Sequence, residues 1–515
     1  MRLRSSAALL AFCIIAVLAV GRTGAAAPTR LIVVQNGDAN TLDPFNDGIN
    51  QGLGIGRAFY NGLFGFNETM KVRPGLVTTW SVSADGLTYT FHLHQGVTFH
   101  DGTPFNAAAV KANFDRVLDP ANHIQKYGLY HTVSGIDKVT VVDDSTVQMH
   151  LAHPSATLIN NLAHPSDGII SPAALAKYGS QGIASHPVGT GPFIFDSWTR
   201  GDRIVAKRNP HYWQPGLPAV DEIVFRDVPD GTQALAMLKT GEAQFVYPVD
   251  PVNVKALAGQ AGVRVDASPS IFVTSLLMNE HYAPFSKRGV RLAMNYAVNK
   301  QALISTLYLG YAREMKSVVG SQLDGYVPVG TYPFDPEKGK RLLAEAGYPN
   351  GFAATLWLPN DSINQKHAVF LQQQFAQIGV RMTVVPMESA TFDNNLFLGP
   401  DKSTSQLIIF GFSPSNGATD WALRANFSTA AWTPKLFNAG FYSNPKVDAL
   451  FTQAERSTST AQRNAYYKQI QEMIFEDAPW VWLAEEMDIT GISTRVSNAY
   501  TLPDQTVQVQ DARMQ

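Results

Sequence analysis

Histidine and aspartate side chains near residue 100 are the first groups in this chain that could do chemistry. His92 and His94 lie two residues apart in a segment with alternating polar and apolar side chains, and His100 and Asp101 follow closely. In a strand, residues two apart share one face, and imidazole and carboxylate groups are common zinc ligands. The spacing fixes no third ligand, and a solvated strand face explains the same pattern. We therefore expect no metal site here.

A glycine-rich segment, Gly52-Leu-Gly54-Ile-Gly56, raises the possibility of a phosphate-binding loop. A dinucleotide-binding fingerprint needs its third glycine at position 57, where Arg57 stands. The sequence also contains no P-loop, no His-Glu-x-x-His pair and no Gly-x-Ser-x-Gly elbow. We expect no cofactor and no catalytic residues, although a hydrolase whose side chains converge only in the fold stays open.

The N-terminus has the pattern of a secretory signal peptide. Arg2 and Arg4 precede an apolar run from Ala7 to Val20, which small residues follow. Such a run is too short to span a bilayer of roughly 30 Å as a helix, but it has the usual length of a signal peptide's apolar region. Residues 1–26 are therefore predicted to be removed after export, with cleavage after Ala26.

Loss of these residues changes the charge and the chemistry of the chain. It removes three of the 40 Lys and Arg residues and none of the 42 Asp and Glu residues, so the mature chain carries a net charge of about −5. This charge does not favour binding to nucleic acid. The single cysteine, Cys13, is also removed, which excludes disulfides and thiol chemistry.

The mature chain is longer than the roughly 250–300 residues that one hydrophobic core organises, so two or three domains are expected.

Strand and helix patterns alternate along most of the chain, which predicts an α/β fold with mixed or parallel sheets. Predicted strands are residues 31–34, 87–99, 139–142, 147–151, 222–226, 356–358, 380–385 and 480–483. Predicted helices are residues 106–118, 171–179, 231–239, 335–346, 366–378, 445–456 and 461–476.

Several of these segments resemble one protein family. The stretch DGLTYTFHLHQGVTFHDG at residues 85–102 and the stretch that begins with Phe105 are similar to the signature region of bacterial extracellular solute-binding proteins of family 5. This family comprises the peptide and nickel binders of ABC importers. The similarity continues in the family's order at residues 188–193, 209–213, 284–300 and 335–352, and it covers about residues 30–515.

The resemblance implies a periplasmic-binding-protein fold of two α/β lobes, of the Venus flytrap type, with an extra domain inserted in lobe I. Crossing strands join the lobes, and the implied hinge lies near residues 268–276 and 483–487. The expected boundaries are residues 28–62, 186–268 and 485–515 for lobe I, 63–185 for the insert and 269–484 for lobe II.

Within the family, the C-terminal third most closely resembles the members that bind glutathione, notably at residues 420–423 and 436–444. Dipeptide binders of the family carry an aspartate for the ligand's ammonium shortly after the pair matched by Gly411 and Phe412. Ser415 stands near that place here, and the acid is displaced to Asp420. The resemblance therefore favours glutathione or a similar short γ-glutamyl peptide, whose amine sits elsewhere.

Glutathione has one ammonium and two carboxylates, so its site needs an acid and strong donors such as arginine. The candidates are Asp420 for the ammonium, Arg116 or Arg57 for a carboxylate, Tyr60 and Trp421 as walls, and Thr190 with the Gly191 backbone for peptide groups. Each also has an ordinary structural explanation, such as a surface ion pair, a core aromatic, a helix cap or a turn.

The resemblance further implies a monomeric periplasmic protein that delivers its ligand to the permease and ATPase subunits of an ABC importer in the inner membrane. Two alternatives remain. The first is a di- or oligopeptide or nickel-chelate binder of the same family, and the second is a secreted peptidase.

Overall fold

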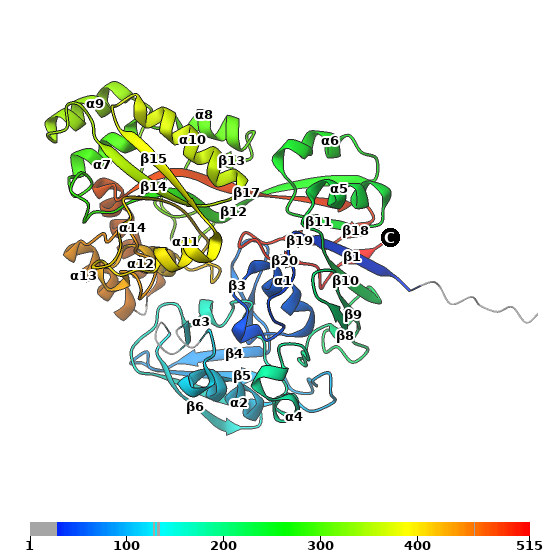
Figure 1. Cartoon of the computed structure of the whole chain (residues 1–515). Helices are drawn as coiled ribbons and strands as arrows, with labels where there is room; N and C mark the ends of the chain where they lie inside the picture. Colours follow the sequence, from blue (N-terminus) through cyan, green and yellow to red (C-terminus); the bar gives the residue numbers. More distant parts are fainter. Residues whose placement is uncertain (1–27, 127–128, 131–133, 458) are drawn as a thin grey trace, which may run out of the picture.

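A large mixed β-sheet organises the protein, which we describe from a computed structural model covering residues 28–126, 129–130, 134–457 and 459–515 (Figure 1). Eleven strands form this sheet, ten of them in one row. The row is β15 (Arg381–Met387), β14 (Ala353–Pro359), β16 (Leu407–Phe412), β12 (Val263–Met278), β17 (Trp480–Ser493), β11 (Phe245–Tyr247), β1 (Arg30–Gln35), β10 (Glu222–Asp227), β9 (Arg203–Arg208) and β8 (Phe193–Thr199), and β13 (Ala312–Arg313) pairs with β17.

Two long antiparallel strands, β12 of 16 residues and β17 of 14 residues, join the two halves of this sheet. Their N- and C-terminal halves lie in different parts of the molecule, because β11 pairs with residues 491–492 of β17 whereas β16 pairs with residues 273–278 of β12. The register between β12 and β17 shifts between Pro269 and Val273, which marks a β-bulge or irregularity in the pairing. We call this segment, where the two strands pass from one lobe to the other, the bend.

Lobe II is built on β14, β15 and β16, and it occupies the upper left of Figure 1. Strand β14 runs parallel to both neighbours, and its buried Leu356 and Leu358 pack in one core with Leu371. Its helices are α7 (Arg288–Tyr296), α8 (Lys300–Leu307), α9 (Pro336–Glu345), α10 (Ser362–Ala376), α11 (Ser389–Leu396), α12 (Thr419–Phe427), α13 (Pro445–Arg456) and α14 (Thr460–Asp477).

Lobe I is built on β1, which pairs in parallel with β10 and β11. Leu235, Leu238 and Leu257 from its helices form a separate core with Ile489 of β17. Its helices are α1 (Asn50–Phe59), α5 (Gly231–Thr240) and α6 (Val254–Ala258), and the short strands β18 (Val496–Ser497), β19 (Tyr500–Thr501), β20 (Val507–Gln508) and β21 (Arg513–Met514) complete it.

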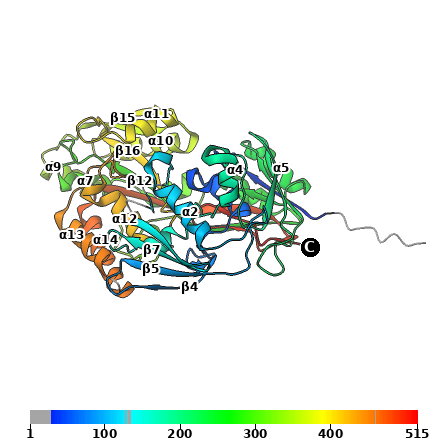
Figure 2. The same cartoon turned by 90° about the horizontal axis from the view of Figure 1, so that it is seen from below.

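A four-stranded antiparallel sheet of order β4-β5-β7-β6 lies below both lobes in Figure 1, and Figure 2 shows the molecule from that side. We call this part the insert. Its elements are β2 (Phe64–Phe66), β3 (Val72–Pro74), β4 (Val77–Val82), β5 (Thr88–Leu93), β6 (Ile136–Asp143), β7 (Thr146–Leu151), α2 (Ala107–Leu118), α3 (Leu158–Asn161) and α4 (Pro172–Gly182).

The expected helix ends follow from local capping groups. Helix α2 begins after Asn106, whose side chain accepts a hydrogen bond from the Ala109 N–H, and α4 begins with Pro172 after the capping side chain of Ser171. Helix α5 ends at Gly241, whose φ of 80° is the left-handed conformation that glycine adopts without strain.

The predicted α/β class and two-lobed fold are confirmed, and so is the existence of every predicted strand and helix. Three predicted bounds differ from the structure by four residues or more. Helix α10 begins four residues earlier than expected, at Ser362, because Asp361 caps it. Strand β5 ends at Leu93 rather than Phe99, and β17 continues from the predicted residues 480–483 to Ser493. The exact lobe boundaries stay predictions.

The predicted signal peptide, residues 1–26, lies outside the described residues. Within the part that the structure describes, no helix combines the length and apolarity that a membrane span requires.

Candidate functional site

Lobe II meets the insert at the loop that precedes α12, residues 413–417, which we call the contact loop. The Asn416 side-chain amide donates to Asn161 Oδ1 at 2.7 Å, and the Asn160 amide donates to the Asn416 carbonyl at 3.3 Å. Asn416 and Asn161 are 2% and 0% exposed. Buried amides need such partners, so this contact stabilises the arrangement in which lobe II lies against the insert.

A groove of about 1080 Å³, open solvent included, runs beside this contact. We call it the interlobe groove, because the insert forms one wall and lobe II the other. Trp80, Tyr89 and Asn160 belong to the insert wall, and the basic residues Arg456 and Arg463 belong to the lobe II wall. His153 Nδ1 lies 3.1 Å from Glu455 Oε1 and thus links the same two parts. The groove thus offers aromatic walls and charges of both signs, because Asp85 and Glu455 line it beside the two arginines, at a surface that exists only when the parts meet.

The bend between the lobes carries three acidic side chains of β17 with partners on both sides. Glu486 accepts hydrogen bonds from Thr274 and Tyr308 of lobe II, at 2.7 and 3.0 Å, and Asp488 accepts one from Tyr247 of lobe I at 2.9 Å. The third, Glu485, accepts from the Ser321 backbone at 3.0 Å. Burial raises the pKa of each carboxyl. These bonds fix β17 to both lobes at the bend.

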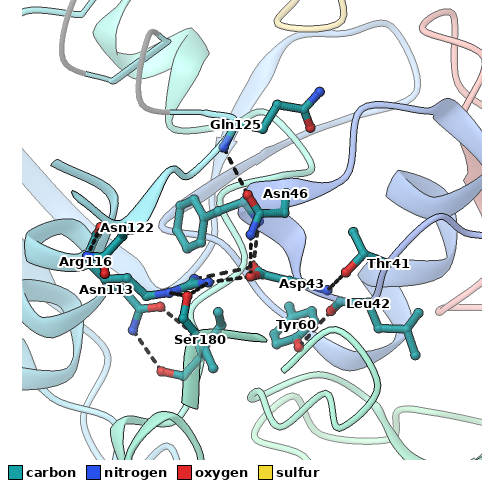
Figure 3. Close-up of polar contacts among 12 residues, drawn as sticks. Thr41, Leu42, Asp43, Asn46, Tyr60, Asn113, Arg116, Asn122, Gln125 and Ser180 are labelled. Atoms are coloured by element: carbon teal, nitrogen blue, oxygen red, sulfur yellow. Dashed lines mark hydrogen bonds and ion pairs between the residues drawn. The ribbon is translucent and has the colours of Figure 1, made fainter. Parts of the chain in front are cut away.

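Arg116, predicted for a ligand carboxylate, has internal partners. Its guanidinium forms a buried ion pair with Asp43, and its Nε donates to Ser180 Oγ at 3.0 Å (Figure 3). Asp43 and Arg116 are 1% and 8% exposed. The pair joins the turn before α1 in lobe I to helices α2 and α4 of the insert, which is a structural role.

Tyr60, Thr190 and Gly191 lie together where lobe I meets the insert. The Tyr60 hydroxyl donates to the Leu42 carbonyl at 3.0 Å, and Thr190 Oγ1 donates to Asn61 Oδ1 at 3.1 Å. The Gly191 carbonyl accepts from His100 Nε2 at 2.9 Å and from Asn209 Nδ2 at 3.0 Å. All three predicted residues are therefore engaged within the protein, and ligand contact by them stays a prediction.

Asp420 and Trp421 lie in the first turn of helix α12, shortly after the contact loop. Asp420 is 6% exposed and binds Arg424 through two bonds, Nε to Oδ2 at 2.8 Å and Nη2 to Oδ1 at 2.9 Å. Its charge is thus already matched by a guanidinium on the same helix. Trp421 is half-buried, with its ring centroid 6.3 Å from that of Phe437. Of the two, Trp421 keeps surface free for a ligand.

Arg57 and Tyr60 are the predicted residues that line a cavity, which we call the lobe I cavity. It encloses about 720 Å³, open solvent included, between the end of α1, the β2–β3 hairpin and the C-terminal segment. Its lining residues lie within 57–75, 163–168, 192–214 and 508–511, so none comes from lobe II. The structure therefore brings Arg57 and Tyr60 together, away from Asp420 and Trp421.

His92 and His94, whose spacing raised the possibility of a metal site, do not converge. His92 is exposed on β5, and the His94 ring packs 5.0 Å from that of Trp213. Among the described residues, no group of three or more His, Cys, Asp or Glu side chains is placed to hold a metal ion.

Sequence reasoning missed the residues that make the contact between the parts. Asn160 and Asn161 carry no signal beyond two adjacent amides, and Arg456 reads as an ordinary helix end. Asn416 precedes Gly417, a dipeptide typical of turns, and Gly417 has a φ of 63°. That turn, together with the neighbouring Ser415, was the sequence signal that could have pointed to the contact loop.

Comparisons with known proteins agree with this architecture. Residues 71–434 match the family described as bacterial extracellular solute-binding proteins, family 5 Middle. The glutathione-binding protein GsiB of Pectobacterium atrosepticum is 42% identical over 476 residues, which cover 92% of this chain and 91% of the relative. GsiB of Escherichia coli K12 is 40% identical, with 94% of each chain covered.

Solved structures show the same fold. The periplasmic binding protein DppA of Helicobacter pylori, in complex with the peptide STSA, superposes with a TM-score of 0.82 at 28% identity and covers 95% of this chain and 98% of its own. HbpA2 of Haemophilus parasuis superposes with a TM-score of 0.84 at 25% identity and covers 94% of this chain and 100% of its own.

Proposed function

The chain belongs to the bacterial extracellular solute-binding proteins of family 5, and on that premise we propose that it captures glutathione or a similar short γ-glutamyl peptide for an ABC importer. The observation that carries this proposal is the 42% identity to a glutathione-binding protein over 92% of the chain. The two lobes and the bend between them support it, because a ligand that touches both lobes stabilises their closed arrangement by its differential affinity.

We place this capture in the periplasm. The protein is exported with residues 1–26 as its signal peptide, acts as a monomer and hands its ligand to the permease and ATPase subunits without altering it. The apolar run between Ala7 and Val20 and the family membership support this assignment.

Ligand contacts come from the surfaces where lobe II meets the insert. The contact loop, Trp421 and the lobe II wall of the interlobe groove supply one side, and Asn160 with the insert wall of the groove supplies the other. Arg456 and Arg463 are the basic partners for the two carboxylates. Ser415 is half-exposed and its backbone N–H donates to the Ser413 carbonyl, so its hydroxyl offers hydrogen bonds rather than a charge. This assignment gives Arg57 and Arg116 no part in glutathione binding.

Calorimetric titration of the mature chain with reduced glutathione tests the proposal. About 20 non-hydrogen atoms at about −0.3 kcal/mol each predict a dissociation constant of tens of micromolar or lower. Mass spectrometry of the recovered ligand should show it unchanged. Arg456→Met should weaken binding roughly tenfold, and Arg341→Met, on the exposed side of α9, should not. Absence of heat at millimolar glutathione, or turnover of the peptide, would overturn the proposal.

Ser415→Asp should shift the ligand preference toward ordinary dipeptides. A carboxylate at this position can form a charge-assisted bond with a dipeptide's ammonium, which raises dipeptide affinity roughly tenfold or more. The same charge repels the carboxylates of glutathione and weakens its binding. Calorimetry with a dipeptide and with glutathione measures both effects.

The matched control is Ser305→Asp, which adds the same charge to an exposed position of α8 in lobe II. Equal dipeptide affinity in the wild type and Ser415→Asp would show that the contact loop does not hold the ligand's amine. The peptide STSA in the Helicobacter pylori structure supports an ordinary peptide as the competing ligand class.

A further inference from the structure

The lobe I cavity has an unusual arginine at its inner end. Among the described residues, Nε and Nη2 of Arg57 have no hydrogen-bond partner, although its side chain is only 14% exposed. The nearest opposite charge is Asp504, with 3.8 Å between Nη2 and Oδ2. Burial lowers the pKa of Arg57, and Asp504 opposes that shift. A guanidinium presents five donors, so this one has free capacity for an acceptor.

Two buried amides lining the same cavity are also unsatisfied. Gln508 Oε1 and Gln510 Nε2 have no hydrogen-bond partner among the described residues, and both side chains are 5% exposed. A buried polar group left without a partner costs about 1–3 kcal/mol. Three such residues around one hollow indicate a polar occupant that supplies both an acceptor and a donor.

The remaining walls carry charges of both signs and rigid rings. Arg73 is exposed on β3, and burial raises the pKa of Asp511 while Arg73 opposes that shift. The rings of Tyr212 and Trp213 lie 5.9 Å apart, and the Trp213 indole N–H donates to Asn61 Oδ1 at 2.9 Å, which fixes the ring. Small-molecule sites typically combine aromatic side chains with a small number of precisely placed polar groups.

We propose that the lobe I cavity is a second binding site, separate from the site for glutathione, and that it takes a small zwitterion of the free α-amino acid class. The carboxylate is bound by Arg57 and by the Gln510 amide, with Arg73 at the mouth. The ammonium is bound by Asp511 and by Gln508 Oε1. A purely anionic ligand would leave these last two acceptors unmatched.

The cavity also has a physical connection to the lobe contact. Phe64 and Arg73 of the β2–β3 hairpin line the cavity, and Phe66 and Met70 of the same hairpin pack around Gly417 of the contact loop, where an added Cβ would lie 3.4 Å from each of them. An amino acid in the cavity therefore acts on the hairpin that meets lobe II. Any effect on glutathione affinity must be reciprocal, because coupling of two binding equilibria is symmetric.

The test uses the full mature chain and a panel of free L-amino acids at up to 10 mM, and calorimetry records the thermal unfolding. At least one amino acid should raise the melting temperature, acetate and ammonium chloride should not, and the effect should persist at saturating glutathione. Because Arg57→Met would leave Asp504 buried without its ion-pair partner, the variants are Arg73→Met and Asp511→Asn, which should each weaken amino acid binding at least tenfold.

Arg203→Met, an exposed arginine of β9 outside the cavity, is the matched control and should bind like the wild type. The proposal is overturned if no amino acid stabilises the protein, if saturating glutathione abolishes the effect, or if both variants bind normally. Failure of glutathione binding alone leaves this site unaffected, so the two proposals are tested separately.

Discussion

Asp43→Ala should lower the free energy of unfolding by about 3–5 kcal/mol, because it leaves the Arg116 guanidinium buried without a counter-charge. Asp43 also accepts hydrogen bonds from the Phe45 N–H at 3.2 Å and from the Asn46 side chain at 2.9 Å. The substitution thus removes the cap of the short helix Pro44–Asn46 and the link between lobe I and the insert. Urea unfolding followed by tryptophan fluorescence measures the loss.

The double variant Asp43→Leu/Arg116→Met should recover much of this loss, since replacing a buried ion pair with apolar groups is often nearly neutral. The control is Lys111→Ala on the same helix α2, which breaks an exposed pair with Asp115 and should cost less than about 1 kcal/mol. If Asp43→Ala costs no more than Lys111→Ala, Arg116 does not depend on Asp43 and is available to another partner.

Gly191→Ala should destabilise the protein by about 3 kcal/mol or more. An added Cβ would lie 2.4 Å from the carbonyl carbon of Phe59 and 2.6 Å from the Ala58 carbonyl oxygen, and backbone atoms cannot rotate away. Overpacking of a close contact typically costs 1–3 kcal/mol when side chains can adjust, and here they cannot. Thermal unfolding of the purified variant measures the effect.

The control is Gly56→Ala in helix α1, where an added Cβ meets nothing within 4 Å. Alanine favours a helix over glycine by roughly 0.5–1 kcal/mol, so this variant should be slightly more stable than the wild type. A Gly191→Ala variant as stable as the wild type would show that α1 and Gly191 are farther apart in solution, and would leave the Gly191 backbone open to a ligand.

The fold was predictable where local signals and burial agree. Asn106, Ser171 with Pro172, and Gly241 mark helix ends that the structure confirms, because each acts on its own turn of chain. The length of β17 was not predictable from its residues. Glu485, Glu486 and Asp488 interrupt the apolar pattern after Leu483, and they are tolerated in a strand because side chains from both lobes bind them.

The candidate site was less predictable, because it depends on residues far apart in the sequence. Arg116 and Asp43 are 73 positions apart, so the sequence did not show that the guanidinium already has a partner. The same holds for Asn161 and Asn416, which are 255 positions apart. Only Asp420 and Arg424, four residues apart on one helix, could have been paired from their spacing.

The contacts between lobe II and the insert explain how ligand binding can change the shape of the protein. The bonds among Asn160, Asn161 and Asn416 and the contact of His153 with Glu455 all require lobe II to lie against the insert. A ligand that adds contacts on both sides shifts the population toward that arrangement, by as much as its affinity differs between the open and closed forms. A membrane partner can then distinguish loaded from empty protein by shape.

Small-angle X-ray scattering of the mature chain during a titration with reduced glutathione tests the central claim most directly. We expect the radius of gyration to fall saturably, over the same ligand concentrations at which calorimetry shows binding, as lobe II closes on the insert. Binding heat with an unchanged radius of gyration, or neither binding nor compaction at millimolar glutathione, would contradict it.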